Sequence, residues 1–124
     1  MTLRFIRAEL ARNPENPDGD PNDAYEFTMP LNAEGAMDVD AWHASENAWT
    51  FTRYHGGEET LHGQIVETDD GDWAFSYEAG DADDEKLFSF DRHRIVPDEY
   101  LSVTDTSGVE HVYRIVIVAN PPGV

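Results

Sequence analysis

The sequence predicts an all-β fold: a small antiparallel barrel or barrel-like sandwich of seven to eight strands with one short helix. Three observations lead to this class. Short runs rich in β-branched and aromatic residues follow one another, turn residues recur about every ten positions, and one segment alone has helical spacing. We favour a barrel because closing the sheet removes the exposed edges that so many short strands would otherwise present. The length suits a single domain over residues 1–124.

The first part of the chain predicts two strands separated by an acidic loop. Apolar and charged residues interleave over a strand-like length at residues 3–11. Residues 13–23, NPENPDGDPND, follow with three prolines and a glycine, which predicts an exposed, flexible loop. Apolar and polar residues then alternate over residues 25–31, as in a half-buried strand, and Pro30 places that strand at a sheet edge or near its own end. The helix is expected at residues 38–47, with Asp38 or Asp40 as its N-cap.

The middle of the chain predicts a three-stranded meander at residues 49–55, 60–68 and 73–78. A two-residue turn at Asp70-Gly71 would place Val66 opposite Phe75. A four-residue turn in the first hairpin would place Trp49 opposite the same valine. One face of the sheet then carries Trp49, Phe51, Val66, Trp73, Phe75 and Tyr77. We interpret this face as core, since a slip of a single residue would scatter the aromatic rings over both faces.

The last part of the chain predicts an acidic loop, a strand and a hairpin. Residues 78–85, EAGDADDE, form the loop, and a strand starts at residues 87–90 and runs toward residues 92–96, where Pro97 ends it. The hairpin pairs residues 99–104 with residues 109–118. Residues 119–124 read as a frayed tail.

The charge of the chain is its strongest functional signal. Twenty-six acidic residues against eight basic ones give a formal net charge of -18. Such a surface attracts cationic groups and repels nucleic acid and anionic membranes, so neither of these is an expected partner. Solubility alone is the simplest alternative explanation of the charge, and adaptation to high salt is a further one. No signal peptide or membrane span is read from the sequence, and the expected location is cytoplasmic.

The acidic loops supply the candidate binding residues: Asp18, Asp20, Asp23, Asp81, Asp83, Asp84 and Glu85. Asp18, Asp20 and Asn22 match the first alternating positions of a calcium loop. That pattern then fails, because Asp23 stands where it needs glycine and Met29 where it needs a bidentate glutamate. The five histidines show no metal-binding spacing either, so we expect no metal and no cofactor.

Arg92 and Arg94 are candidates for binding an anion, since alternation puts both on one face of a strand. Internal compensation of the surrounding acids is the simpler interpretation. The chain has no cysteine and no motif that pairs a nucleophile with a base or cradles a phosphate, so no catalytic residue is assigned. An enzyme would have to assemble its site from distant strands.

The expected function is therefore a non-enzymatic binding or interaction module that meets a basic protein partner through residues 15–23 and 78–85. One alternative is a barrel that binds a small apolar molecule in a cavity lined by Trp49, Phe51, Trp73, Phe75 and Tyr77. Another is nucleic-acid mimicry, in which alternate acids of an extended segment, spaced by ~6.6 Å, imitate successive phosphates. The oligomeric state is left open.

Overall fold

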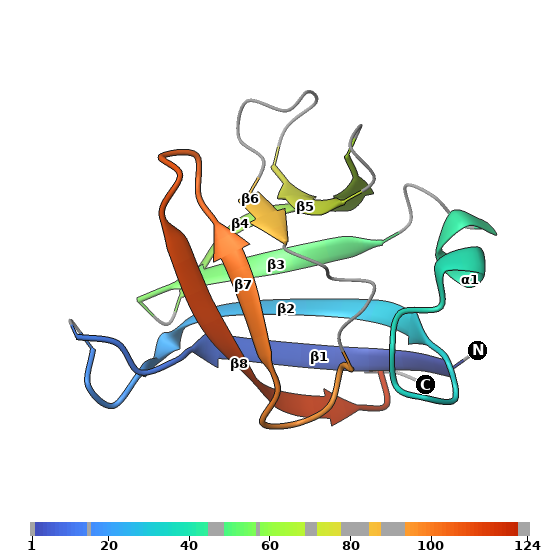
Figure 1. Cartoon of the computed structure of the whole chain (residues 1–124), viewed down its shortest axis with the longest axis horizontal. Helices are drawn as coiled ribbons and strands as arrows, with labels where there is room; N and C mark the ends of the chain where they lie inside the picture. The colour runs from blue at the N-terminus through green and yellow to red at the C-terminus, as the bar shows by residue number, and fades with distance from the viewer. Residues whose placement is uncertain are drawn as a thin grey trace.

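The computed structural model describes residues 2–14, 16–44, 49–56, 58–68, 72–77, 85–87 and 94–121. Within these ranges the elements are β1 (Thr2–Leu10), β2 (Asp20–Leu31), α1 (Val39–Ala44), β3 (Thr50–His55), β4 (Glu58–Glu67), β5 (Trp73–Ser76), β6 (Glu85–Leu87), β7 (Tyr100–Thr104) and β8 (Glu110–Ala119). Each strand pairs antiparallel with the next, and β1 pairs with β8, so the sheet closes into a barrel (Figure 1). The predicted all-β class, the antiparallel barrel and the short helix are confirmed.

The up-and-down order gives the barrel two distinct ends. The connections β1–β2, β3–β4, β5–β6 and β7–β8 must all emerge at one end, which we call the loop end. The remaining connections emerge at the opposite end, which we call the helix end. It also carries α1 and both termini of the chain (Figure 1). Residues far apart in the sequence are therefore brought together at each end.

Helix α1 covers the helix end of the barrel. Its N-cap is Asp38, one of the two residues predicted for this role, whose carboxylate accepts a hydrogen bond from the Ala41 amide at 3.0 Å. Trp42 of the helix is buried and meets the Trp73 ring edge-on, with centroids 4.8 Å apart. The Trp49 indole donates to the Trp42 carbonyl at 2.9 Å. Burial of these rings anchors the short helix, which would be unstable alone.

Aromatic rings fill the middle of the barrel. Tyr25 stacks on Phe75 with centroids 4.3 Å apart, and Phe51 lies 4.5 Å from the same ring. Five of the six residues predicted to share the inner face do so: Trp49, Phe51, Trp73 and Phe75 are buried, and Tyr77 packs against the core. Alternation within β3 and β5 is sufficient to place these side chains correctly.

The predicted position of Val66 is wrong. Ile65 lies opposite Phe75 and is buried, whereas Val66 pairs with Ala74 and is half-buried. The Thr68 amide donates to the Asp72 carbonyl at 2.8 Å in the connection between β4 and β5, so three residues, not the predicted two, lie between the last bonded pair. The β3–β4 register is displaced by one residue as well, with Phe51 opposite Gly63. Both displacements move β4 alone, so its alternation is inverted while β3 and β5 keep their faces.

Several predicted boundaries also need correction. Strand β2 begins at Asp20, so residues 20–23 belong to a strand and not to the predicted loop. Glu85 begins β6, and Ala119 ends β8, although they were predicted as loop and tail. Ile95 is buried outside any strand, held by a 2.7 Å hydrogen bond from its amide to the Gly35 carbonyl, where the sequence predicted a strand.

Pro30 stands near the end of its strand, as predicted. It pairs with Leu3 on one side, while β3 pairs only with residues 24–27 of β2. The missing amide of the proline therefore disturbs no ladder on its other side. Its carbonyl accepts a hydrogen bond from the Asp38 amide at 2.9 Å, which leads the chain into α1.

Candidate binding site

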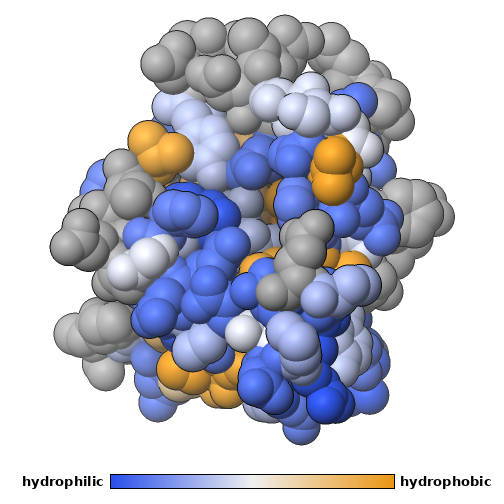
Figure 2. All heavy atoms as spheres, turned by 90° about the vertical axis from the view of Figure 1, so that its left-hand side faces the viewer, coloured by the Kyte–Doolittle hydropathy of each residue, from blue (hydrophilic) through white to orange (hydrophobic). Residues whose placement is uncertain are grey.

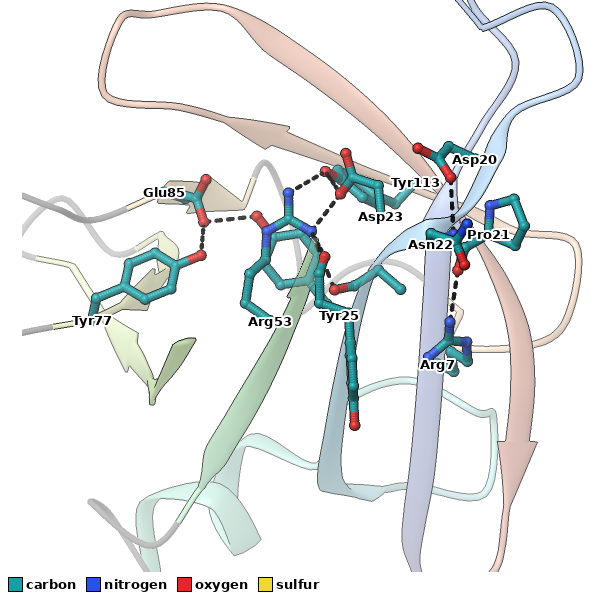
Figure 3. Close-up of polar contacts among 12 residues, drawn as sticks. Arg7, Asp20, Pro21, Asn22, Asp23, Tyr25, Arg53, Tyr77, Glu85 and Tyr113 are labelled. Atoms are coloured by element: carbon teal, nitrogen blue, oxygen red, sulfur yellow. Dashed lines mark hydrogen bonds and ion pairs between the residues drawn. The ribbon is translucent and has the colours of Figure 1, made fainter. Parts of the chain in front are cut away.

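Polar side chains point into the barrel at the loop end, beyond the aromatic core. Alternation along β2 turns Asp23 and Tyr25 inward, and Arg53 of β3 lies directly opposite Tyr25. The inward residues that hydrogen-bond to one another here are Asp23, Tyr25, Arg53, Tyr77, Glu85 and Tyr113 (Figure 3). We call this set the polar cluster. It joins strands from both halves of the chain.

Arg53 has several partners in and beside the polar cluster. Its guanidinium forms an ion pair with Asp23, and the two side chains are 14% and 15% exposed. It also donates to the Tyr54 carbonyl at 2.6 Å, and its Cζ atom lies 4.5 Å from the centre of the Tyr25 ring. Burial lowers the pKa of Arg53, but Tyr25 and Asp23 raise it by more, so the pKa is raised overall. The buried positive charge is thus compensated inside the barrel.

Glu85 is held by two tyrosine hydroxyls. Its Oε1 atom accepts a hydrogen bond from Tyr25 at 2.7 Å and a second one from Tyr77. The Tyr77 ring meets Phe51 edge-on at 5.1 Å, which anchors its hydroxyl on the core. Among the residues that the structure describes, Glu85 forms no ion pair. The carboxylate is therefore positioned by neutral donors.

The environment keeps all three tyrosines of the cluster neutral. Burial is the main reason why the pKa values of Tyr25, Tyr77 and Tyr113 are raised. Glu85 raises the pKa of Tyr25 and Tyr77 further, since a second negative charge beside it is unfavourable. With one arginine and two carboxylates, the polar cluster carries a single net negative formal charge.

An exposed leucine lies beside the polar cluster. Leu61 pairs with Arg53 across β3 and β4, so both side chains stand on the same side of the sheet. Leu61 is 49% exposed, whereas Ile65 on the same side of β4 is buried. The face on the left of Figure 1 is mainly hydrophilic and carries a few separate hydrophobic spots (Figure 2). The loop end thus combines negative charge with limited apolar surface.

The structure separates the predicted acidic residues into different roles. Asp18 is exposed in the β1–β2 connection, and Asp20 accepts a hydrogen bond from the Asn22 amide at 2.9 Å. Asp23 is committed to Arg53, and Glu85 belongs to the polar cluster. The predicted residues Asp81, Asp83 and Asp84 lie outside the described ranges.

The two candidate anion-binding arginines are not brought together in the described part of the chain. Arg94 is exposed near the helix end, where its Nε donates to the Glu34 carbonyl at 3.4 Å. Arg92 lies outside the described residues. The arginine that the barrel does enclose is Arg53, which sequence reasoning missed. The sequence held one signal for this position: Arg53 is two residues from Phe51, and this spacing places both side chains on the same face of a strand.

Metal-ligating side chains meet only in pairs within the described ranges. His43 contacts Glu67 at 3.1 Å and His111 contacts Asp105 at 2.9 Å, and no group of three ligands is found there. The hydrogen bond from His111 is the main reason why the pKa of Asp105 is lowered. None of the described helices has the length and apolarity needed to cross a membrane. Comparisons with protein-family models, curated proteins and solved structures give no match for this chain.

Proposed function

We propose that this protein is a non-enzymatic binding module and that a basic protein docks on its loop end. The observation that carries the proposal is the polar cluster, which keeps a net negative charge after Arg53 has been compensated by Asp23. Glu85 supplies that charge at the same end of the barrel as the β1–β2 and β7–β8 connections.

Further acidic residues surround the polar cluster. Asp18 and Asp20 lie where β2 begins, and Asp105 and Glu110 lie in and beside the β7–β8 connection. A formal charge of -18 on the whole chain adds long-range attraction for a cationic partner. Such attraction raises the association rate and disfavours anionic competitors more than it raises affinity.

The alternative of a small apolar ligand inside the barrel has less support. Eight strands make an interior that is either filled by side chains or able to hold one small ligand. Here the rings of Tyr25 and Phe51 both reach Phe75, at 4.3 Å and 4.5 Å, so a ligand would have to displace them. The hypothesis of nucleic-acid mimicry depends on acidic residues at alternate positions of an extended segment, and most of these residues lie outside the described ranges.

The proposal is tested by titrating the protein with a lysine-rich peptide and with the same peptide fully acetylated. Binding of the unmodified peptide should weaken at least tenfold between about 0.02 M and about 0.5 M NaCl, since screening shortens the range of the attraction. The acetylated peptide should not bind. Equal binding of both peptides, or an affinity independent of salt, would show that charge is not what the protein recognises.

A further inference from the structure

One oxygen of Glu85 is left available in the polar cluster. Both tyrosine hydroxyls donate to Oε1, and Oε2 has no hydrogen-bond partner in the part of the chain that the structure describes. The side chain is half-buried, so water solvates it only partly. A carboxylate in this position gains from a cation that reaches its second oxygen.

Arg53, the nearest inward-pointing cation of the described residues, is committed elsewhere. It pairs with Asp23 and donates to the Tyr54 carbonyl at 2.6 Å and to the Tyr113 hydroxyl at 3.3 Å. Moving it to Glu85 would leave Asp23 as an unpaired, largely buried carboxylate, which is strongly unfavourable. Within the described residues Glu85 is thus left without a cation of its own.

The free oxygen selects the type of cation. A guanidinium group binds best through two parallel hydrogen bonds to both oxygens of a carboxylate. Because Oε1 already accepts two hydroxyls, Glu85 offers one oxygen, which suits the compact point charge of an ammonium group. Exposed Leu61 lies on the same inner side of the sheet and provides apolar surface for an alkyl chain.

We propose that Glu85, Tyr25, Tyr77 and Leu61 form a socket for an alkylammonium group. The ammonium ion binds Oε2 of Glu85, and its alkyl chain packs against Leu61 and the ring of Tyr77. This inference rests on the proposed function and deepens it by naming the group that is recognised. A lysine side chain of a protein partner and a free alkylamine share this chemistry.

The first experiment compares the wild type with Glu85→Gln and with the control Glu99→Gln, which lies at the helix end just before β7. Glutamine keeps an oxygen that accepts both tyrosine hydroxyls, and each variant removes one charge. Glu85→Gln should weaken binding of the lysine-rich peptide about tenfold or more, a change that corresponds to ~1.4 kcal/mol. Glu99→Gln should change it less than about twofold, as expected for an exposed charge far from the loop end. A matched peptide with arginine in place of lysine should bind wild type more weakly.

The second experiment uses hexylammonium and methylammonium as free probes and follows Tyr77 and Leu61 by NMR. Hexylammonium should shift these resonances in the wild type and not in Glu85→Gln. Leu61→Ala should weaken the binding of hexylammonium and leave the binding of methylammonium unchanged, because only the longer alkyl chain reaches the apolar surface.

The two experiments separate the inference from the proposed function. If wild type binds the lysine peptide and Glu85→Gln binds it equally well, the socket is wrong while the proposed function stands. If no peptide binds wild type, the proposed function fails, and hexylammonium shifts at Tyr77 and Leu61 still support the socket. If these resonances do not respond to hexylammonium, the socket is overturned in either case.

Discussion

Gly63 lies directly opposite Phe51, so close that a Cβ atom on Gly63 would stand 2.8 Å from the Phe51 ring. The Ser76 carbonyl approaches the same point from the other neighbouring strand. A glycine is needed here because the ring passes over the β4 backbone to reach Phe75, with centroids 4.5 Å apart. The aromatic core of the barrel depends on this absence of a side chain.

Replacement of Gly63 by alanine should destabilise the protein. The added methyl group has to displace a buried ring and a backbone carbonyl, which costs about 1–3 kcal/mol. Urea unfolding of the variant measures the loss. Phe51→Leu in the Gly63→Ala background should cost less than Phe51→Leu alone, since the smaller side chain relieves the clash. An unchanged midpoint for Gly63→Ala would mean that the β3–β4 register is wrong.

Removal of the Arg53 charge should destabilise the folded protein strongly unless Asp23 is changed as well. Arg53→Met leaves a carboxylate that is 15% exposed without its cation, which we expect to cost about 2–4 kcal/mol. The double variant Arg53→Met, Asp23→Asn removes both charges and should recover part of this loss. Unfolding free energies of the two single variants and the double variant form the cycle that measures the coupling. Strictly additive losses would contradict a buried ion pair.

Stability should fall above pH 10. The pKa values of Tyr25, Tyr77 and Tyr113 are raised above the ordinary 10.0 in the folded protein, so the unfolded chain releases these protons first. Their contribution is complete below pH 10 and is lost as the pH rises. For each of the buried residues Tyr25 and Tyr113, the free energy of unfolding should fall by up to ~1.4 kcal/mol per pH unit above pH 10. The loss from half-buried Tyr77 should be smaller. Urea unfolding at several alkaline pH values tests this, and Tyr77→Phe should reduce the slope.

High salt should stabilise the folded protein, because a formal charge of -18 makes the compact state repel itself. Unfolding midpoints in urea at about 0.01 M and about 1 M NaCl measure the effect, with a Debye length of ~30 Å in the first case and ~3 Å in the second. Sodium chloride and tetramethylammonium chloride should raise the unfolding midpoint equally if screening is responsible. A lower midpoint in 1 M salt would show that ion pairs such as that of Arg53 dominate the electrostatics.

The sequence was sufficient for the class of fold and for the inner faces of β3 and β5, since alternation places their aromatic residues directly. The sequence predicted the wrong inner face for β4, because register depends on the number of residues in each turn. A turn predicted one residue too short exchanges the inward and outward side chains of the strand that follows or precedes it. The polar cluster could not be predicted either. Its hydrogen bonds join Tyr25 to Glu85 and Asp23 to Tyr113, which are 60 and 90 positions apart.

The most direct test of the proposed binding end compares two triple variants that remove the same charge from opposite ends of the barrel. The loop-end variant carries Asp18→Asn, Asp20→Asn and Glu110→Gln, and the helix-end variant carries Glu34→Gln, Asp40→Asn and Glu99→Gln. Affinity for the lysine-rich peptide in about 0.05 M NaCl is measured by calorimetry, where screening is moderate. We expect the loop-end variant to bind several-fold more weakly than the helix-end variant. Equal losses in both would show that the partner responds to net charge alone, without any preferred end of the barrel.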